Sequence, residues 1–308
     1  MKLMQSAQIS SKKDLSLVCK YYGIRPDLVQ AGGGNISIKD GNKLYIKSSG
    51  CMLFDVEPDK NISTVNLKKV KNFKILENIS EKDFLKKTTI SGSQPSLETF
   101  FHSLTAKYTV HLHPVVVVQA LQKYKDKLIE KYGDVAAFID YYKPGLELSK
   151  HIDYSKNIIF LEKHGLIVHY DDLHDVESAL KDIVNYCAFL IKYDITVYNK
   201  LSELQSQIYS SYGVQPYIVY TDVDFPRYIR QTPDCVIYTN GYCDTDILPY
   251  IPVCYKNGDD NYIIAKNFLK CKQIEQVLKM YENVTTELND EDVENLMNWD
   301  SEKYRKDL

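Results

Sequence analysis

Residues 105–121 read TAKYTVHLHPVVVVQAL and place two histidines, His111 and His113, one residue apart in a run of β-branched and apolar side chains. This composition predicts a buried strand from His111 to Val118. Side chains alternate between the two faces of a strand, so residues i and i+2 point the same way, about 6.6 Å apart along the chain. Two imidazoles placed like this can bind one ion, although two hydrogen-bonded core histidines would give the same pattern.

The bulk composition limits the classes of protein to consider. The chain has 308 residues, with 38 Lys and Arg against 41 Asp and Glu, and a formal net charge of −3. This length suits one large domain, or a domain with a sizeable extension. The lysines are scattered and form no basic block with interleaved aromatic residues, so nothing in the composition points to nucleic-acid binding.

The N-terminal segment and the cysteines bear on the cellular compartment. The first residues, MKLMQSAQISSKKDLSLVCKYYG, lack the apolar core of a signal peptide, and no apolar run is long enough to cross a bilayer. The seven cysteines are odd in number and include no CxxC pair, which argues against a zinc ribbon and against a secreted disulfide scaffold. We therefore expect a cytoplasmic protein without a membrane or nucleic-acid partner.

Predicted strands and helices are interspersed without strict βαβ alternation, which favours a mixed α/β fold. A hairpin is expected around the turn Asp40-Gly41-Asn42, and Ser96 is expected to cap a short helix. The stretch after the histidine strand, up to Tyr142, is predicted to be less regular. The pattern changes near Gly213, which predicts a domain over residues 1–212 and an extension over 213–308. Further helices are expected at 14–22, near 143–152, and at 173–193, 201–212, 274–281 and 290–299.

Two further residues could join the histidine pair in one site. His164 stands at the end of another apolar strand, directly before a glycine. A third imidazole there would complete a three-histidine site with an open position, the arrangement that a catalytic zinc ion requires. Glu98 lies in the first turn of the helix expected just upstream. The helix dipole alone would favour a carboxylate at that place, but a general base beside a metal would also stand there.

Two short glycine loops are candidate anion sites. The sequence GGGN occupies residues 32–35 and SSG occupies residues 48–50. Glycines allow backbone N–H groups to converge on an anion, and Asn and Ser side chains add donors. The chain has no GxGxxG or Walker motif, so a nucleotide is not indicated, and ordinary glycine turns would look the same.

The order GGGN…SSG…PSLET…HLHP…EKHG resembles the class II aldolase/adducin family over roughly residues 10–200. Enzymatic members of this family include L-fuculose-phosphate and L-rhamnulose-phosphate aldolases. The segments QPSLETFFH, YYKPGLELSKHI and FLEKHGLIV are most similar to long members in which a rhamnulose-phosphate aldolase part precedes a dehydrogenase. QTPDCVIYTN, at residues 231–240, resembles the segment that follows the aldolase core in those proteins.

The resemblance implies roles for particular residues. His111, His113 and His164 match the ligands of zinc or of another divalent transition metal, and Glu98 matches the acidic residue that binds the metal or acts as the catalytic base. Residues matching the positions that hold the substrate phosphate are Asn35, Ser49, Gly50 and Ser96. Leu97 departs from the fuculose-type enzymes, which have a second phosphate-binding serine there, and His102 is expected behind the site or in a structural role.

The resemblance also implies a fold and an assembly. We expect a three-layer α/β/α domain with a central, mainly antiparallel sheet, followed by a C-terminal α/β extension. The family usually forms four-fold homotetramers with active sites between subunits. The extension over residues 213–308 would then be a packing or interface element, or a cover over the substrate.

The implied activity is the retro-aldol cleavage of a ketose 1-phosphate to dihydroxyacetone phosphate and a small aldehyde. Relatives also include a pentulose-phosphate 4-epimerase, dehydratases and decarboxylases, and the distinction depends on residues outside these motifs. The proton on the aldehyde oxygen commonly comes from a tyrosine of a neighbouring subunit, and the 25 tyrosines here offer no basis for choosing one. Adducins, which are binding modules, lack the metal histidines, so the intact histidines and Glu98 favour an enzyme.

Overall fold

The computed structural model describes residues 11–73, 79–223, 236, 242–243, 253–280 and 288–298. The chain divides into two compact units, Met1–Ser202 and Glu203–Leu308. Apart from Val236, the segment 231–240 that entered the family resemblance lies outside the described residues.

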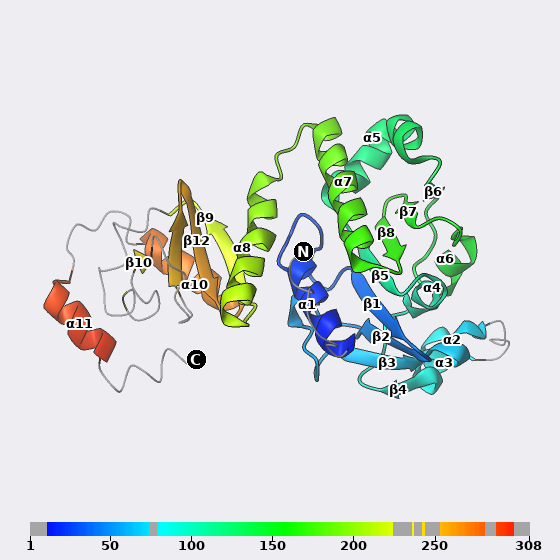
Figure 1. Ribbon diagram of the computed structural model, residues 1–308, viewed down its shortest axis with the longest axis horizontal. Helices are drawn as coiled ribbons and strands as arrows, with labels where there is room; N and C mark the ends of the chain where they lie inside the picture. The colour runs from blue at the N-terminus through cyan, green and yellow to red at the C-terminus, as the bar shows by residue number, and fades with distance from the viewer. Residues whose placement is uncertain are drawn as a thin grey trace. The chain divides into compact units, whose positions relative to one another are not determined.

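The first unit is built on an eight-stranded sheet with the strand order β4-β3-β2-β1-β5-β8-β7-β6 (Figure 1). All neighbouring strands in this sheet run antiparallel except β6 and β7, which are parallel. The expected central, mainly antiparallel sheet is therefore confirmed. The strands are β1 (Asn35–Asp40), β2 (Lys43–Lys47), β3 (Ile62–Asn66), β4 (Thr89–Ser91), β5 (Tyr108–Leu112), β6 (Ala136–Ile139), β7 (Ile158–Leu161) and β8 (Gly165–Tyr170).

Helices cover both faces of the sheet, which gives the expected three layers (Figure 1). The apolar residues of α1, α5 and α7 form one core with Val110 and Leu112 of β5. On the opposite face, α4 and α6 pack against β7 and β8, and α2, α3 and α4 pack against β2 and β3. The helices are α1 (Ser11–Gly23), α2 (Leu67–Lys71), α3 (Glu81–Thr88), α4 (Thr99–Leu104), α5 (Val115–Tyr132), α6 (Leu146–His151) and α7 (Leu173–Ile191), with a 3-10 turn η2 (Leu53–Asp55).

The histidine strand is shorter than its sequence predicts. β5 ends at Leu112, and the valines that follow Pro114 form the first turn of α5. Proline suits a helix start because it has no N–H to leave unpaired there and its φ is already close to helical. Val116, Val117 and Ala120 are buried on one side of the helix, so packing outweighs the β-propensity of valine. The predictions of a strand to Val118 and of an irregular stretch beyond it are wrong.

The short helix α4 also begins later than predicted. Its first residue is Thr99, and Glu98 occupies the N-cap position. Ser96 instead closes a turn in front of the helix, because its carbonyl oxygen accepts hydrogen bonds from the backbone N–H and the hydroxyl of Thr99. Pro95 forms an isolated β-bridge with Ser48, which keeps the preceding chain extended. Ser96 is therefore not the helix cap.

The second unit contains a four-stranded sheet of order β10-β11-β12-β9. Its core includes Cys254 and Ile263 of the sheet and Cys271, Ile274 and Leu278 of α10. The helix α8 (Thr196–Tyr212) crosses the division between the two units. The remaining elements are β9 (Tyr217–Thr221), β10 (Tyr242–Cys243), β11 (Val253–Asn257), β12 (Asp260–Ala265), α10 (Phe268–Met280) and α11 (Asp290–Asn298).

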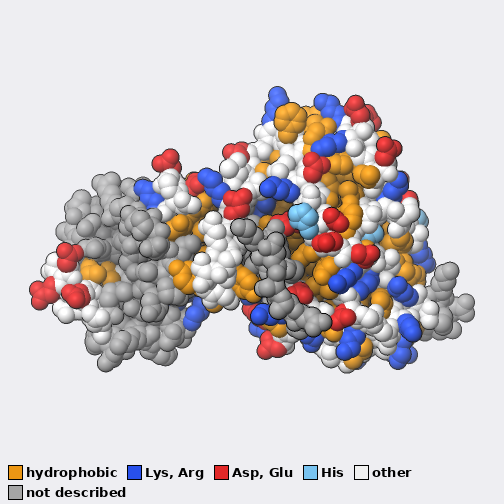
Figure 2. Space-filling view, viewed as in Figure 1, with side chains coloured by type: hydrophobic (Ala, Val, Ile, Leu, Met, Phe, Trp, Pro, Cys, Tyr) orange, Lys and Arg blue, Asp and Glu red, His pale blue; other side chains and the backbone are white. Residues whose placement is uncertain are grey.

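The visible surface of the first unit mixes acidic and basic side chains. Figure 2 shows blue and red groups interspersed among hydrophobic ones on this face, as the small net charge suggests. Among the described residues, no helix is both long and apolar enough to cross a lipid bilayer.

The core beside β7 gives a direct test of this packing. Phe160 is fully buried, and its ring stacks on that of Phe138 with centroids 4.8 Å apart. We expect Phe160→Ala to lower the free energy of unfolding by about 3–5 kcal/mol, because it removes buried apolar surface and leaves a cavity. Urea unfolding followed by circular dichroism would measure the loss.

The matched control is Phe189→Ala in α7. The Phe189 side chain is 75% exposed, so the same substitution should change the free energy of unfolding by less than about 0.5 kcal/mol. Equal losses in the two variants would contradict this description of the core.

Candidate metal centre

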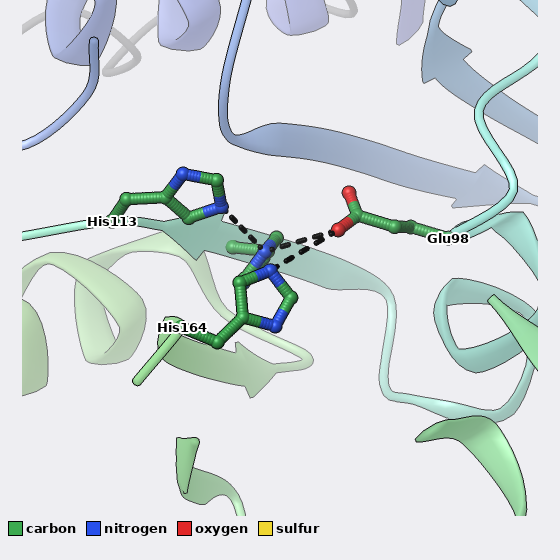
Figure 3. Close-up of side chains that lie close together, drawn as sticks. Glu98, His113 and His164 are labelled. Atoms are coloured by element: carbon green, nitrogen blue, oxygen red, sulfur yellow. Dashed lines mark hydrogen bonds and ion pairs between the residues drawn. The ribbon is translucent and has the colours of Figure 1, made fainter. Parts of the chain in front are cut away.

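Four side chains from separate parts of the first unit meet at one point. Glu98 comes from the start of α4, His111 from β5, His113 from just beyond β5, and His164 from the turn between β7 and β8. One ligand atom from each residue lies within 4.8 Å of the others. In Figure 3 the labelled side chains of Glu98, His113 and His164 point toward one another. The structure thus brings together all four residues that the sequence placed in one site.

The distances within this group are those of a ligand set. Glu98 Oε1 lies 3.2 Å from His111 Nε2 and 3.7 Å from His164 Nε2. His113 Nε2 lies 3.1 Å from His111 Nε2. The Nε2 atoms of three imidazoles and one carboxylate oxygen therefore face a common centre.

A backbone hydrogen bond orients the His111 imidazole. Its Nδ1 lies 3.1 Å from the carbonyl oxygen of Leu166, on the neighbouring strand β8. A carbonyl can only accept, so Nδ1 donates this hydrogen bond and Nε2 faces the cluster. This arrangement, in which one ring nitrogen bonds to the backbone and the other faces the candidate site, is the usual one for a metal-binding histidine.

The positions of the other two histidines depend on close backbone approaches. The backbone N–H of His113 donates to the carbonyl of Leu28, which holds His113 in place beyond the end of β5. Gly165 follows His164 at the start of β8, and a Cβ there would lie only 2.2 Å from the carbonyl oxygen of Leu112. Only glycine lets β8 begin this close to β5, and that approach brings His164 to His113.

The electrostatics of the cluster suit a cation. Burial raises the pKa of Glu98, but the surrounding imidazoles, led by His111, outweigh burial and leave this pKa below its usual range. The pKa of His113 is lowered to about 4 and that of His164 to about 3. Burial of the two rings is the largest cause of both shifts. At neutral pH the carboxylate is therefore ionised and these two imidazoles are neutral, as metal ligands must be.

The donor set itself indicates the kind of metal. Imidazole nitrogens with a carboxylate oxygen are typical ligands of zinc and of other divalent first-row transition metals. The ionised Glu98 and the neutral His113 and His164 fit such an ion. The site can hold one divalent transition metal.

The residues predicted to hold a phosphate lie on three neighbouring segments. Asn35 opens β1 directly opposite His111, is buried, and its side-chain Oδ1 has no hydrogen-bond partner among the described residues. Ser49 and Gly50 lie in an exposed turn after β2. The backbone N–H of Ser49 donates to Gln94, two residues before Ser96. Their roles in binding remain predictions.

The neighbours Leu97 and His102 lie outside the group of ligand atoms. The Leu97 side chain is 40% exposed. His102 is fully buried, with Nδ1 2.7 Å from the Ser37 hydroxyl and its ring stacked on Phe101. This environment fits the structural role expected for His102.

Lys47 is a residue near the site that the sequence analysis missed. It ends β2, is only 2% exposed, and its Nζ donates to the carbonyl oxygens of Gly32 and Cys51. The alternating segment KLYIK reads as a strand with exposed lysines at both ends. The position of Lys47 directly before the SSG loop was the one available signal.

The approach of Gly33 to His113 provides a test of the metal centre. A Cβ at Gly33 would lie 2.8 Å from His113 Nδ1. We therefore expect Gly33→Ala to displace the imidazole and to weaken metal binding by about 10- to 100-fold, as changes around a ligand typically do. Competition with a chelating indicator dye would measure the affinity.

Gly32→Ala is the matched control on the adjacent residue. A Cβ at Gly32 meets its nearest atom, the Cys51 carbonyl oxygen, at 3.8 Å, an ordinary contact. Its metal affinity should equal that of the wild type. If both alanine variants bind metal equally well, His113 does not ligate it in the position described.

Comparison with known proteins agrees with this architecture. A class II aldolase domain from Thermoplasma acidophilum aligns at 23% identity and a TM-score of 0.53, covering 62% of this chain and 99% of its own. An L-fuculose-1-phosphate aldolase from Thermus thermophilus aligns at 15% identity and 0.42, covering 59% and 95%. A sugar-phosphate aldolase from Thermotoga maritima aligns at 16% identity and 0.43, covering 59% and 94%. The Thermoplasma domain, whose TM-score is above 0.5, shares its fold with this chain.

Family membership follows from the sequence match. No curated protein gives a significant match to this chain. The family model "Class II Aldolase and Adducin N-terminal domain" matches residues 13–191, more than half of the chain. The chain therefore belongs to the class II aldolase and adducin family.

Proposed function

We propose that this chain is a metal-dependent lyase that cleaves the C3–C4 bond of a ketose 1-phosphate into dihydroxyacetone phosphate and a small aldehyde. The observation that carries the proposal is the group of three imidazoles and one carboxylate whose ligand atoms lie within 4.8 Å of one another. A purely structural role would not need four buried or half-buried ionisable groups at one point, because their burial is costly without an ion. Membership of the family supports the same conclusion.

In this proposal His111, His113 and His164 hold the metal, and zinc is the ion that we expect. A bound divalent cation would act as a Lewis acid toward the ketose carbonyl and hydroxyl oxygens and would stabilise the negative charge that develops during cleavage. The Leu166 carbonyl keeps the His111 ring turned toward the ion.

Glu98 is the proposed catalytic base. Its carboxylate is ionised, and its Oε1 atom lies within hydrogen-bond distance of the ligand His111. A carboxylate at this place can take up a proton from solvent and deliver it to C3 after the C3–C4 bond has broken, while the proton lost by the C4 hydroxyl passes to solvent, so that protons balance. The proton that leaves the C4 hydroxyl needs a second group, for which we propose a tyrosine of a neighbouring subunit in a homotetramer.

The substrate phosphate is the proposed anchor of the reacting carbons. The amide of Asn35, the turn at Ser49 and Gly50, and the hydroxyl of Ser96 would bind it through hydrogen bonds. Fixing the phosphate fixes the distance from C3 and C4 to the metal and to Glu98, which lowers the entropic barrier of the reaction. We also propose that residues 1–212 form the catalytic domain and that residues 213–308 form a separate extension.

A combined metal and activity assay tests the proposal. Purified wild type should contain close to one divalent metal ion per chain by elemental analysis and should release dihydroxyacetone phosphate from at least one of a panel of ketose 1-phosphates. His113→Ala should lose the metal, and its kcat/KM should fall by roughly 100-fold or more, because several kcal/mol of charge stabilisation disappear. His174→Ala, at an exposed histidine of α7, should behave as wild type.

Two results would contradict the aldolase. Metal without triose release, together with epimerisation of ribulose 5-phosphate, would assign the site to the epimerase reaction. Absence of metal from the wild type after expression in zinc-supplied medium would leave an adducin-like binding module.

Glu98→Gln separates the proposed base from the ligands. Glutamine keeps the shape of the side chain but cannot take up a proton, so we expect kcat to fall by about 10²–10⁴-fold while the three histidines still bind metal. Elemental analysis and the triose assay on the same sample would measure both. Undiminished kcat would show that Glu98 is not the base.

A further inference from the structure

The turn after α1, residues 24–30, holds the backbone of the proposed metal ligand His113. The carbonyl of Leu28 accepts a hydrogen bond from the N–H of His113 at 2.9 Å. The side-chain amide of Gln30 donates to the carbonyl of His113 at 3.4 Å. Both backbone polar groups of His113 are therefore bound by this one turn.

A buried ion pair fixes the shape of the turn. Arg25 Nε lies 3.0 Å from Asp27 Oδ1 and Arg25 Nη2 lies 2.6 Å from Asp27 Oδ2, so the guanidinium binds the carboxylate through two hydrogen bonds. The two side chains are only 10% and 4% exposed. The backbone carbonyl of Arg25 accepts from the N–H of Leu28, and that of Asp27 accepts from the N–H of Val115. The ion pair thus lies at the base of the contacts that hold residues 113–115.

The same guanidinium also reaches helix α8. Arg25 Nη1 donates to the side-chain Oδ1 of Asn199 at 2.6 Å. Asn199 lies in the part of α8 that belongs to the first unit. Ile195, directly before this helix, is buried in the same apolar core as Leu28. Arg25 therefore connects the start of α8 to the turn that holds His113.

A buried ion pair adds little stability to a turn. Desolvation of the two charges offsets most of their attraction, and apolar residues of similar volume often stabilise a fold at least as well. A guanidinium supplies direction instead, because its N–H donors form a rigid planar fork that sets the angle between the partners it binds. The pair is therefore suited to fixing the position of the chain that it holds.

His113 depends on such a support more than His111 does. His111 lies within β5, whereas the pairing of β5 with β8 ends at Leu112, one residue before His113. The His113 ring also lies close to the backbone, since a Cβ at Gly33 would be 2.8 Å from its Nδ1. A small shift of the His113 backbone would therefore move its Nε2 away from the other ligand atoms.

We propose that Arg25 is a positioning residue of the metal centre: through the turn after α1 it fixes His113, and through Asn199 it makes the metal affinity depend on α8. This inference rests on the proposed function only in that the cluster binds a divalent metal. It does not depend on which reaction the metal supports. Arg25 itself contacts neither the metal nor the substrate in this proposal.

The test is cobalt binding by the metal-free full chain carrying Asn199→Ala. The visible absorption of bound Co²⁺ depends on its coordination geometry, so it reports movement of the ligands. We expect the affinity for Co²⁺ to fall by about 10-fold, as for other groups that orient a ligand, and the spectrum to change. Arg25→Lys keeps the charge but loses the fork, and its affinity should fall by about 10- to 100-fold.

Asn157→Ala is the matched control. Asn157 is half-buried like Asn199, and its amide donates to the carbonyl of His169, at the end of β8 away from His164. Each alanine variant loses one hydrogen bond, so urea unfolding of the metal-free proteins should show similar losses of stability. Asn157→Ala should nevertheless keep the cobalt affinity and the spectrum of the wild type.

A double variant shows whether the effect passes through the bond between Arg25 and Asn199. Its loss of cobalt affinity should be smaller than the product of the two single losses, because the first substitution already removes what the second one breaks. Two losses that simply multiply would overturn the proposed connection.

The remaining outcomes separate this inference from the proposed function. Unchanged cobalt affinity and spectrum in Asn199→Ala overturn it, whatever Arg25→Lys does and whether or not that variant folds. An equal loss in Asn157→Ala would show a general effect of lower stability and would also overturn it. A wild type that binds no cobalt rejects the metal centre and the inference together. Losses confined to the Asn199 and Arg25 variants, in a protein that releases no triose, support the inference and reject the lyase.

Discussion

The antiparallel pairing of β5 with β8 is the constraint on which the metal centre depends. This register places His111 opposite Ile167 and Leu112 opposite Leu166, and the Leu166 carbonyl then fixes the tautomer of His111. The same pairing requires glycine at position 165, where a side chain would collide with the Leu112 carbonyl. A shift of one residue would turn His111 to the opposite face of the sheet, away from Glu98. The position of His111 is thus set by the sheet, and His113 and His164 lie at the ends of its strands.

The sequence predicted which residues form the cluster, but it predicted the secondary structure around them less well. His111 and His113 converge although His113 lies beyond the strand, because its backbone is held by Leu28. The β-propensity of the valines after Pro114 predicts a strand, but they form a helix. Residue preferences do not reveal which side of a segment will be buried. Lys47 was missed for a related reason. The alternation of apolar and polar residues predicts which side chains of a strand share a face. The burial of Lys47 instead depends on two loops that fold over the end of β2.

The charges around the cluster fit the proposed ligands, a cation together with an anion. The cluster contributes one negative charge, from Glu98, and the imidazoles of His113 and His164, whose pKa values lie below their usual value. A divalent ion in the proposed site would leave a net positive charge. A phosphate ester, with close to two negative charges, would bring the site near neutrality. Without these ligands, burial of the same groups is opposed by desolvation.

Two glycines and one buried amide side chain lie beside the cluster. Gly33 lacks a side chain where a Cβ would lie 2.8 Å from His113 Nδ1, and Gly165 lacks one where a Cβ would lie 2.2 Å from the Leu112 carbonyl oxygen. The side-chain Oδ1 of Asn35 is buried and has no hydrogen-bond partner in the described part of the chain. Asn35 pairs with His111 on the neighbouring strand. A core built for stability alone would pair or remove such groups. The buried Oδ1 of Asn35 and the four ionisable side chains of the cluster fit the proposed site, whose ligands would complete their hydrogen bonds and charges.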